Sequence, residues 1–236
     1  MASNSQSTEV RFQAFFDAMF HQAMKKVYTA IPAHVIAFDA ARQVAQIQIG
    51  ILRVDVNGES HAPPPIIECP VLFLGDGFTV EFQIDAGCEG LAVFSQRCLD
   101  GWFQTGGVAA NPLARFHDMS DCLFIPGFRP MPKVITDFQN NGIRIRSRSG
   151  NQFAWLKNDG SIAIENGSGH IRMSADGTVT INGVTIDTSG NVSTSATVTA
   201  STDVNGGGIS LKSHVHGKRS TYLTELRKED GASSPV

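Results

Sequence analysis

Two histidines close to the carboxyl end are the residues whose type and spacing best suggest chemistry. His214 and His216 are separated by one residue, and in an extended strand the side chains at i and i+2 point to the same face. The pair would offer two imidazoles side by side, and nothing nearby supplies a third ligand. Three copies around a threefold axis would bring six ring nitrogens to one point. The pair therefore predicts a metal site only where three chains meet at a trimer axis.

The region that leads to this pair has the pattern of a repetitive β structure. Turn-forming dipeptides recur at spacings of six to ten residues from Asn141-Gly142 to Ser189-Gly190. Between them lie short segments that alternate polar and apolar residues, such as 143–146, 162–164 and 179–181. Alternation with period two and frequent turns indicate short strands in a solenoid or fibre.

The apolar residues of this region are too few to form a core within one chain. Beyond Leu156 the large apolar residues are isolated Ile, Val and Leu residues and Met173. A lone sheet of this kind would leave its apolar face and its edges uncovered. Three chains wound around one axis would bring the Ile and Val side chains together and pair the edges between chains. We therefore expect an intertwined homotrimeric β-helix with the shape of a triangular prism.

The preceding part of the chain has the composition of an ordinary globular domain. All four cysteines and fourteen of the fifteen phenylalanines lie at or before Phe138. Strands are expected at 35–38, 44–51, 71–74, 78–84 and 91–94, with 99–103 a short strand or a turn. About five strands in about 100 residues predict a small barrel, for which the OB fold is the leading interpretation. The predicted fold class is all-β with an N-terminal helix.

Residues 8–28 have the pattern of an amphipathic helix. Their apolar residues follow the i, i+3, i+4 spacing, and the stripe comprises Phe12, Phe15, Phe16, Met19, Phe20, Ala23, Met24 and Val27. Ser7 or Thr8 can cap the helix, and Pro32 prevents its continuation. The stripe could pack on its own domain or dock on another subunit, and we take docking as the prediction.

Composition also limits which partners the protein can bind and in which cellular compartment it is made. A formal net charge of -3 argues against a nucleic-acid partner, which usually requires a concentrated basic surface. The cysteines form no CxxC pair and predict buried free thiols, so we expect assembly in a reducing cytoplasm. No apolar run near the start predicts a signal peptide, and none approaches the roughly 18 residues of a membrane helix.

Several segments together carry a family resemblance. The stretches 29–35, 100–107, 115–121 and 125–130 occur in order before the Ser-His-x-His-Gly sequence that ends at Gly217. Over residues 29–217 the chain resembles the central spike of contractile-tailed bacteriophage baseplates. That family joins an N-terminal OB-fold domain to a trimeric β-helix with a metal-bearing apex. The resemblance implies a cell-puncturing needle, which breaches the host envelope when the tail sheath contracts.

The resemblance also implies a location, partners and a metal. It implies a virion protein of the tail baseplate that contacts hub or tail tube proteins and, transiently, the host outer membrane. His214 and His216 correspond to the apex ligands, and the implied metal is iron in octahedral coordination. Imidazole itself suits Fe, Zn, Cu and Ni alike, whereas six nitrogens disfavour the tetrahedral arrangement usual for zinc.

These observations divide the chain into five segments. They are a docking helix (1–30), an OB-fold domain (31–130), a linker (131–141), the β-helix with its apex (142–217) and a charged tail (218–236). The length and charge of the tail depart from the family pattern. Three arrangements are open for it: packing along the prism, capping it, or having no fixed structure.

The sequence supports two competing functions and one competing site less well. A glycan-cleaving tailspike needs paired carboxylates on a groove, and residues 142–217 contain only five acidic residues. A receptor-binding adhesin usually ends in a head domain, for which only the tail is available. His117, Asp118 and Asp121 could suggest acid–base chemistry, but the two aspartates could equally cap turns. We therefore predict a structural protein that is not an enzyme.

Overall fold

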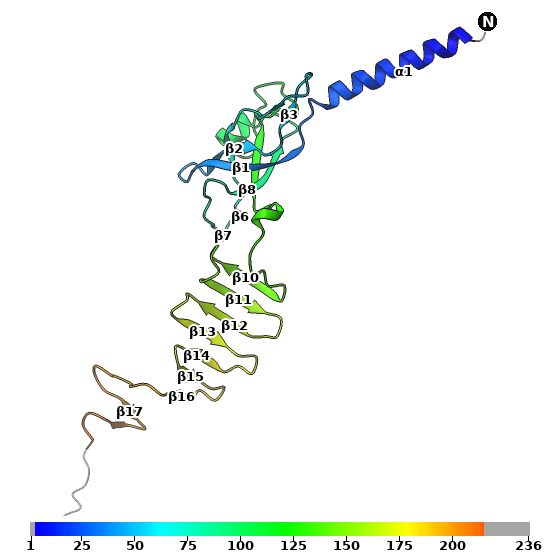
Figure 1. The fold of residues 1–236 in the computed structure, drawn as a ribbon. Helices are drawn as coiled ribbons and strands as arrows, with labels where there is room; N and C mark the ends of the chain where they lie inside the picture. Colours follow the sequence, from blue (N-terminus) through cyan, green and yellow to red (C-terminus); the bar gives the residue numbers. More distant parts are fainter. Residues whose placement is uncertain (1–2, 215–236) are drawn as a thin grey trace, which may run out of the picture. The chain divides into compact units, whose positions relative to one another are not determined.

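The computed structural model describes residues 3–214, and side chains from residue 11 onward. The predictions for His216 and for the 218–236 tail lie outside the described residues. The chain divides into two compact units, Met1–Ile135 and Thr136–Val236, and we call them the barrel unit and the ladder unit. Strands predominate and the described residues form two α-helices, so the fold is mostly β (Figure 1).

Helix α1 spans Ser3–Met24, so it begins before and ends before the predicted range of 8–28. No proline or glycine interrupts residues 3–7, which allows the earlier start. At the other end the amides of Lys26 and Val27 bond three residues back, to Ala23 and Met24. This tighter geometry closes the helix before the chain becomes extended at Ala30. No helix in the described part of the chain is long and apolar enough to span a membrane.

The barrel unit is built on one five-stranded antiparallel sheet. Its strands are β1 (Ala30–Asp39), β2 (Val44–Ile49), β5 (Ile66–Pro70), β8 (Glu89–Phe94) and β9 (Cys122–Pro126). They lie in the order β5-β2-β1-β8-β9. A parallel bridge joins Val71 to Phe124, and the Leu72 amide donates to the Phe124 carbonyl at 2.9 Å. The two outer strands therefore approach each other, and the sheet curls into a half-barrel. The OB type of this barrel stays a prediction.

Several local predictions for the barrel unit were wrong. Residues 99–103 were expected as a strand or turn, but α2 (Asp100–Thr105) is a helix, which Gly106 ends at a positive φ of 67°. The expected strand 78–84 reduces to β7 (Thr79–Val80), which pairs with β6 (Leu74–Gly75). The remaining short elements are β3 (Arg53–Val54), β4 (Ser60–His61) and a 3-10 turn at Met131–Lys133. Strands β5 and β9 were not predicted.

The core of the barrel unit lies inside the curled sheet. Val35, Ile47 and Phe124 are fully buried there. Gly90 on β8 leaves room for the Phe124 ring, because a Cβ at that position would collide with the ring and with the Ile125 carbonyl. Cys69, Cys98 and Cys122 are buried and form no disulfide, as predicted, whereas Cys88 is only half-buried.

The ladder unit is an antiparallel meander. Its sheet contains β10 (Gly142–Arg146), β11 (Phe153–Lys157), β12 (Ile162–Glu165), β13 (His170–Met173), β14 (Val179–Ile181), β15 (Val184–Ile186) and β16 (Val192–Thr194), in sequence order. A hairpin of β17 (Asn205–Gly206) and β18 (Ile209–Ser210) follows. Figure 1 shows the strands succeeding one another from β10 to β16. The strands predicted at 143–146, 162–164 and 179–181 are confirmed, and the homotrimeric β-helix stays a prediction.

The turns of the ladder unit explain the repeated Asp-Gly pairs. The carboxylates of Asp159 and Asp176 accept the amides of Ser161 and Thr178 at 2.8 Å and 2.9 Å. The glycine after each aspartate has a positive φ, which is the conformation glycine adopts without steric cost. These pairs are therefore turn residues, as predicted from their spacing.

Candidate functional site

One face of the ladder unit carries two rows of aliphatic side chains across all seven strands. Cross-strand pairing places Ile143 opposite Leu156. Each following strand then places one apolar residue directly opposite the corresponding residue of the strand before it. The first row is Ile143, Leu156, Ile162, Met173, Val179, Ile186 and Val192; the second is Ile145, Ala154, Ile164, Ile171, Ile181, Val184 and Thr194. Thirteen of these fourteen positions are apolar. We call this surface the aliphatic face.

The aliphatic face is largely uncovered in one chain. Nine of its fourteen side chains are exposed, and Ile143, Ile145 and Val192 expose 71 %, 70 % and 67 % of their surface. A soluble protein rarely leaves so continuous an apolar surface in contact with water. Exposed apolar surfaces of this extent usually mark a place where another molecule binds.

The opposite face of the same sheet carries charged and aromatic side chains. The Arg144 guanidinium lies 4.2 Å from the Phe153 ring centroid and 5.0 Å from that of Trp155. Lys157 lies 4.8 Å from the same indole. Further along, Arg172 and Glu165 form an ion pair at 2.7 Å. Charged side chains thus cover the aromatic residues of this face, and the two faces of the sheet differ clearly in polarity.

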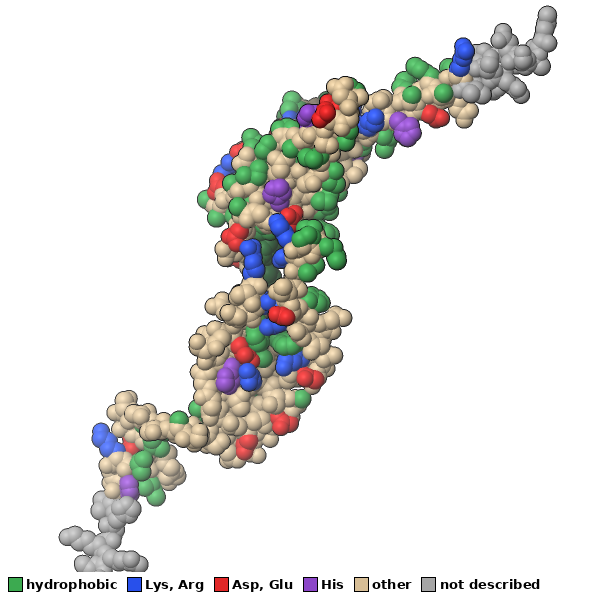
Figure 2. Space-filling view, viewed as in Figure 1, with side chains coloured by type: hydrophobic (Ala, Val, Ile, Leu, Met, Phe, Trp, Pro, Cys, Tyr) green, Lys and Arg blue, Asp and Glu red, His purple; other side chains and the backbone are tan. Residues whose placement is uncertain are grey.

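Helix α1 provides a second exposed apolar surface. Phe12, Phe15, Met19 and Phe20 are each more than half exposed. The Phe12 and Phe16 rings touch edge to face with centroids 4.8 Å apart. Figure 2 shows hydrophobic side chains along this helix. In the described structure the stripe is open to solvent, which agrees with a docking role.

The structure describes one member of the predicted metal pair. His214 is exposed, its amide donates to the Ser210 carbonyl, and its Nδ1 lies 2.6 Å from the Leu211 carbonyl oxygen. A proton on Nδ1 would be donated to that oxygen, which places the ring lone pair on Nε2. Metal-binding histidines commonly have this arrangement, so the donor chemistry of His214 fits a metal. The geometry of the pair depends on His216, outside the described residues.

The residues His117, Asp118 and Asp121 do not converge on one site. His117 Nδ1 lies 3.0 Å from the Tyr28 carbonyl. Asp118 accepts the Ser120 amide at 2.9 Å, so its predicted capping role is confirmed. Asp121 accepts no amide of its own turn; its side chain is fully buried in an ion pair with Arg115. The suggested capping role of Asp121 was wrong.

The Arg115–Asp121 pair was missed by sequence reasoning. Arg115 Nε and Nη2 donate to the two carboxylate oxygens of Asp121 at 3.0 Å and 2.8 Å, and the Leu99 amide adds a bond of 2.9 Å. Burial alone would raise the pKa of Asp121, but the bonds from Arg115 and Leu99 outweigh it and hold this pKa below its usual value. The charge pair therefore anchors the long connection between β8 and β9.

A grouping of possible metal ligands adjoins this ion pair. The ligand atoms of Cys98, Asp100 and Asp121 lie within 4.8 Å of one another. Arg115 Nη2 already contacts all three residues, at 3.2 Å, 3.0 Å and 2.8 Å. Because a guanidinium supplies the positive charge here, the grouping is explained as an ion-pair network.

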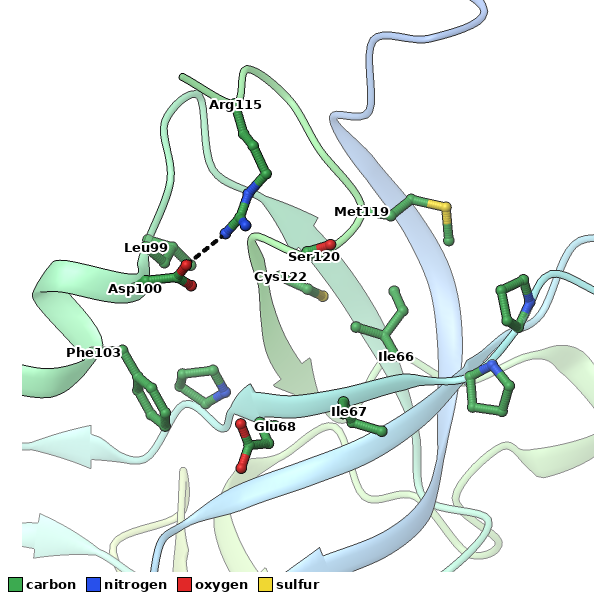
Figure 3. A pocket seen from close by; sticks show the side chains of 13 residues that line it. Ile66, Ile67, Glu68, Leu99, Asp100, Phe103, Arg115, Met119, Ser120 and Cys122 are labelled. Atoms are coloured by element: carbon green, nitrogen blue, oxygen red, sulfur yellow. Dashed lines mark hydrogen bonds and ion pairs between the residues drawn. The ribbon is translucent and has the colours of Figure 1, made fainter. Parts of the chain in front are cut away.

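The same network borders a pocket of about 430 Å³. Figure 3 shows Ile66, Phe103 and Met119 among its lining residues, with the Arg115–Asp100 pair at its edge. Glu68, also on the lining, pairs with Arg42 at 2.6 Å. The charged groups of the pocket are thus engaged in ion pairs, which favours a structural role for this region.

The comparison with known families concerns the barrel unit. Residues 31–127 match the family model described as the phage protein Gp138 N-terminal domain. No curated protein matches the chain. The family match supports a phage structural protein, and hence a component of the virion.

Proposed function

We propose that this protein is the trimeric central spike of a contractile tail baseplate, which punctures the host outer envelope when the tail contracts. The aliphatic face is the observation that supports this proposal most. A double row across seven strands, apolar at thirteen of its fourteen positions, has the pattern of the inner wall of a prism. The polar opposite face would then form the outer surface of the needle.

Burial of the aliphatic face supplies the driving force for assembly. Fully burying one aliphatic side chain contributes about 1.5–3 kcal/mol. Covering nine partly exposed side chains therefore contributes on the order of 10 kcal/mol per chain. Two sheets packed face to face would also cover the rows. Three chains are favoured because only they would bring six imidazoles of His214 and His216 to one axis.

The proposed role is mechanical and involves no catalysis. Closed rotational symmetry gives a straight, uniform shaft, and interwound chains would resist dissociation during penetration. The protein would be assembled in the host cytoplasm and carried in the virion baseplate. Its partners would be two further copies of itself, hub or tail tube proteins and, transiently, the host outer membrane.

The proposal includes a metal ion that His214 and His216 of three chains would bind. These side chains would hold the ion, and a bound iron ion would cross-link the three chain ends. The chain itself contributes the Leu211 carbonyl, which orients the His214 ring. The ion would thus stiffen the tip.

Replacing both His214 and His216 with alanine is expected to remove the metal and leave the trimer intact, because the aliphatic face is unchanged. Metal analysis and light scattering of the purified protein measure both properties. His170→Ala is the matched control, since His170 lies on β13, outside the proposed site. Unchanged metal content in the double variant would show that these histidines are not the ligands.

The α1 stripe is proposed to attach the spike to the baseplate. Deleting residues 1–28 is expected to leave the trimer intact, because the aliphatic face lies in the ladder unit. The deletion is expected to abolish incorporation into virions, because it removes the α1 stripe. Immunodetection of the spike in purified particles measures incorporation. The pair Phe16→Ser and Phe20→Ser should reproduce the loss, whereas His21→Ser, outside the apolar stripe of the same helix, should not. Particles that retain the deleted spike would refute the docking role.

A further inference from the structure

The two outer strands of the barrel unit meet over a very short stretch, which we call the barrel seam. Val71, directly after β5, forms an isolated parallel bridge to Phe124 on β9. A further ladder bond toward the amino end of the two strands would need the amide of Pro70, and a proline has none. The backbone ladder therefore stops at this one bridge.

Two cysteines lie at the barrel seam, one on each strand. Cys69 on β5 and Cys122 on β9 each precede a bridged residue by two positions. Side chains two positions apart point to the same side of a strand, so both thiols face the core together with Val71 and Phe124. The two cysteines expose only 1 % and 2 % of their surface. The parallel register thus places the two buried thiols beside each other.

The two thiols also interact with each other. Hydrogen bonding to the Cys122 thiol, followed by burial, raises the pKa of the Cys69 thiol. Neighbouring strands lie about 4.8 Å apart, and the Cα atoms of a disulfide are usually about 4.4–6.8 Å apart. Cys98, by contrast, has its sulfur 3.2 Å from the guanidinium of Arg115. Cys69 and Cys122 are therefore the cysteines whose placement suits a disulfide.

We propose that Cys69 and Cys122 form a disulfide that closes the barrel seam covalently once the protein has left the reducing cytoplasm. Both thiols are reduced in the structure, as expected for a protein assembled in a reducing compartment, whereas oxidising surroundings such as the surface of a virion favour disulfides. The bond would join two strands that the backbone ladder connects at only one bridge. It concerns the barrel unit alone and does not depend on the proposed trimer.

The oxidation needs an acceptor for two electrons, and a small organic disulfide can supply it. Cys122 is among the lining residues of the pocket described above (Figure 3), so a small disulfide in that pocket would meet Cys122 first. The Cys122 thiolate would attack it, form a mixed disulfide and release one thiolate. Cys69 would then attack the Cys122 sulfur and release the second thiolate. The two cysteines lose two electrons, the small disulfide becomes two thiols, and these take up the two cysteine protons.

Mass spectrometry of the oxidised full-length protein tests the bond. The protein is incubated with cystamine, a small disulfide, both in buffer and in urea below the unfolding transition, because mild loosening admits the reagent to a buried pair. It is then denatured, alkylated and digested without reduction. The digest is expected to contain two peptides linked through Cys69 and Cys122. Absence of this link in both conditions would overturn the proposal.

Two serine variants separate this pair from the other thiols. Cys88→Ser is the matched control, because the Cys88 sulfur contacts the Glu89 carbonyl at 3.8 Å and lies outside the pair. In chemical denaturation, oxidation should lower the unfolded fraction of the barrel unit by at least about 30-fold in the unsubstituted protein and in Cys88→Ser, because the cross-link restricts the unfolded chain. Cys69→Ser should show no such gain. An equal gain in Cys69→Ser would contradict the assigned pair.

Discussion

Replacing Ile181 with aspartate is expected to abolish the trimer. Ile181 lies on β14 in the second aliphatic row, between Ile171 and Val184. In the proposed assembly, three carboxylates would face one another in an apolar interior. Burying an unpaired charge costs several kcal/mol for each group, and three of them would offset most of the gain from covering the face.

The neighbouring residue provides the control for this variant. Thr180 lies on the same strand but on the opposite face, paired with Arg172. An aspartate there would lie beside a cation on the outer surface, so Thr180→Asp should remain trimeric. Light scattering of both variants gives the comparison. A trimeric Ile181→Asp protein would show that the aliphatic face is not the assembly interface.

Replacing Asp121 with alanine is expected to destabilise the barrel unit by about 3–5 kcal/mol, the usual cost of removing one partner of a buried ion pair. The variant would leave Arg115, whose side chain is only 25 % exposed, without its main acceptor. It would also leave the Leu99 amide without its carboxylate. Chemical denaturation followed by a probe in the barrel unit measures the change.

Asp100→Ala is the matched control for the loss of Asp121. Asp100 contacts the same guanidinium at 3.0 Å, but its side chain is 53 % exposed. Exposed pairs contribute at most about 1 kcal/mol, so this variant should change stability little. Equal losses in the two variants would contradict the anchoring role assigned to Asp121.

The same carboxylate makes the stability of the barrel unit depend on acidity. The pKa of Asp121 is lowered in the folded chain, so the unfolded chain binds its proton more readily. The stabilisation is therefore present above the unfolded pKa of about 3.9 and is lost as the pH falls through the lower folded value. Asp121→Ala should lack this part of the acid sensitivity.

The sequence could predict features that depend on neighbouring residues. Alternation and Asp-Gly turns located the short strands of the ladder unit, because each strand pairs with the next one along the chain. The spacing of Phe12, Phe16 and Phe20 similarly predicted a helix, although its ends differed. Sequence patterns therefore gave correct predictions where the contacts that form an element join residues close together in the chain.

The features that were missed depend on distant pairing. Strand β5 follows three prolines and is stabilised by β2 and by the bridge near Phe124, which no local pattern indicates. The carboxylate of Asp121 binds Arg115 and also accepts the amide of Leu99, which lies more than twenty residues before Asp121 in the sequence. Alternation also could not show that the aliphatic residues would align in two unbroken rows, because cross-strand register depends on each turn.

The mass of the purified full-length protein in native solution tests the central claim most directly. Light scattering or native mass spectrometry should give three times the mass of one chain, and this value should not change on dilution, because interwound chains separate slowly. A mass of one or two chains under these conditions would contradict the trimeric spike.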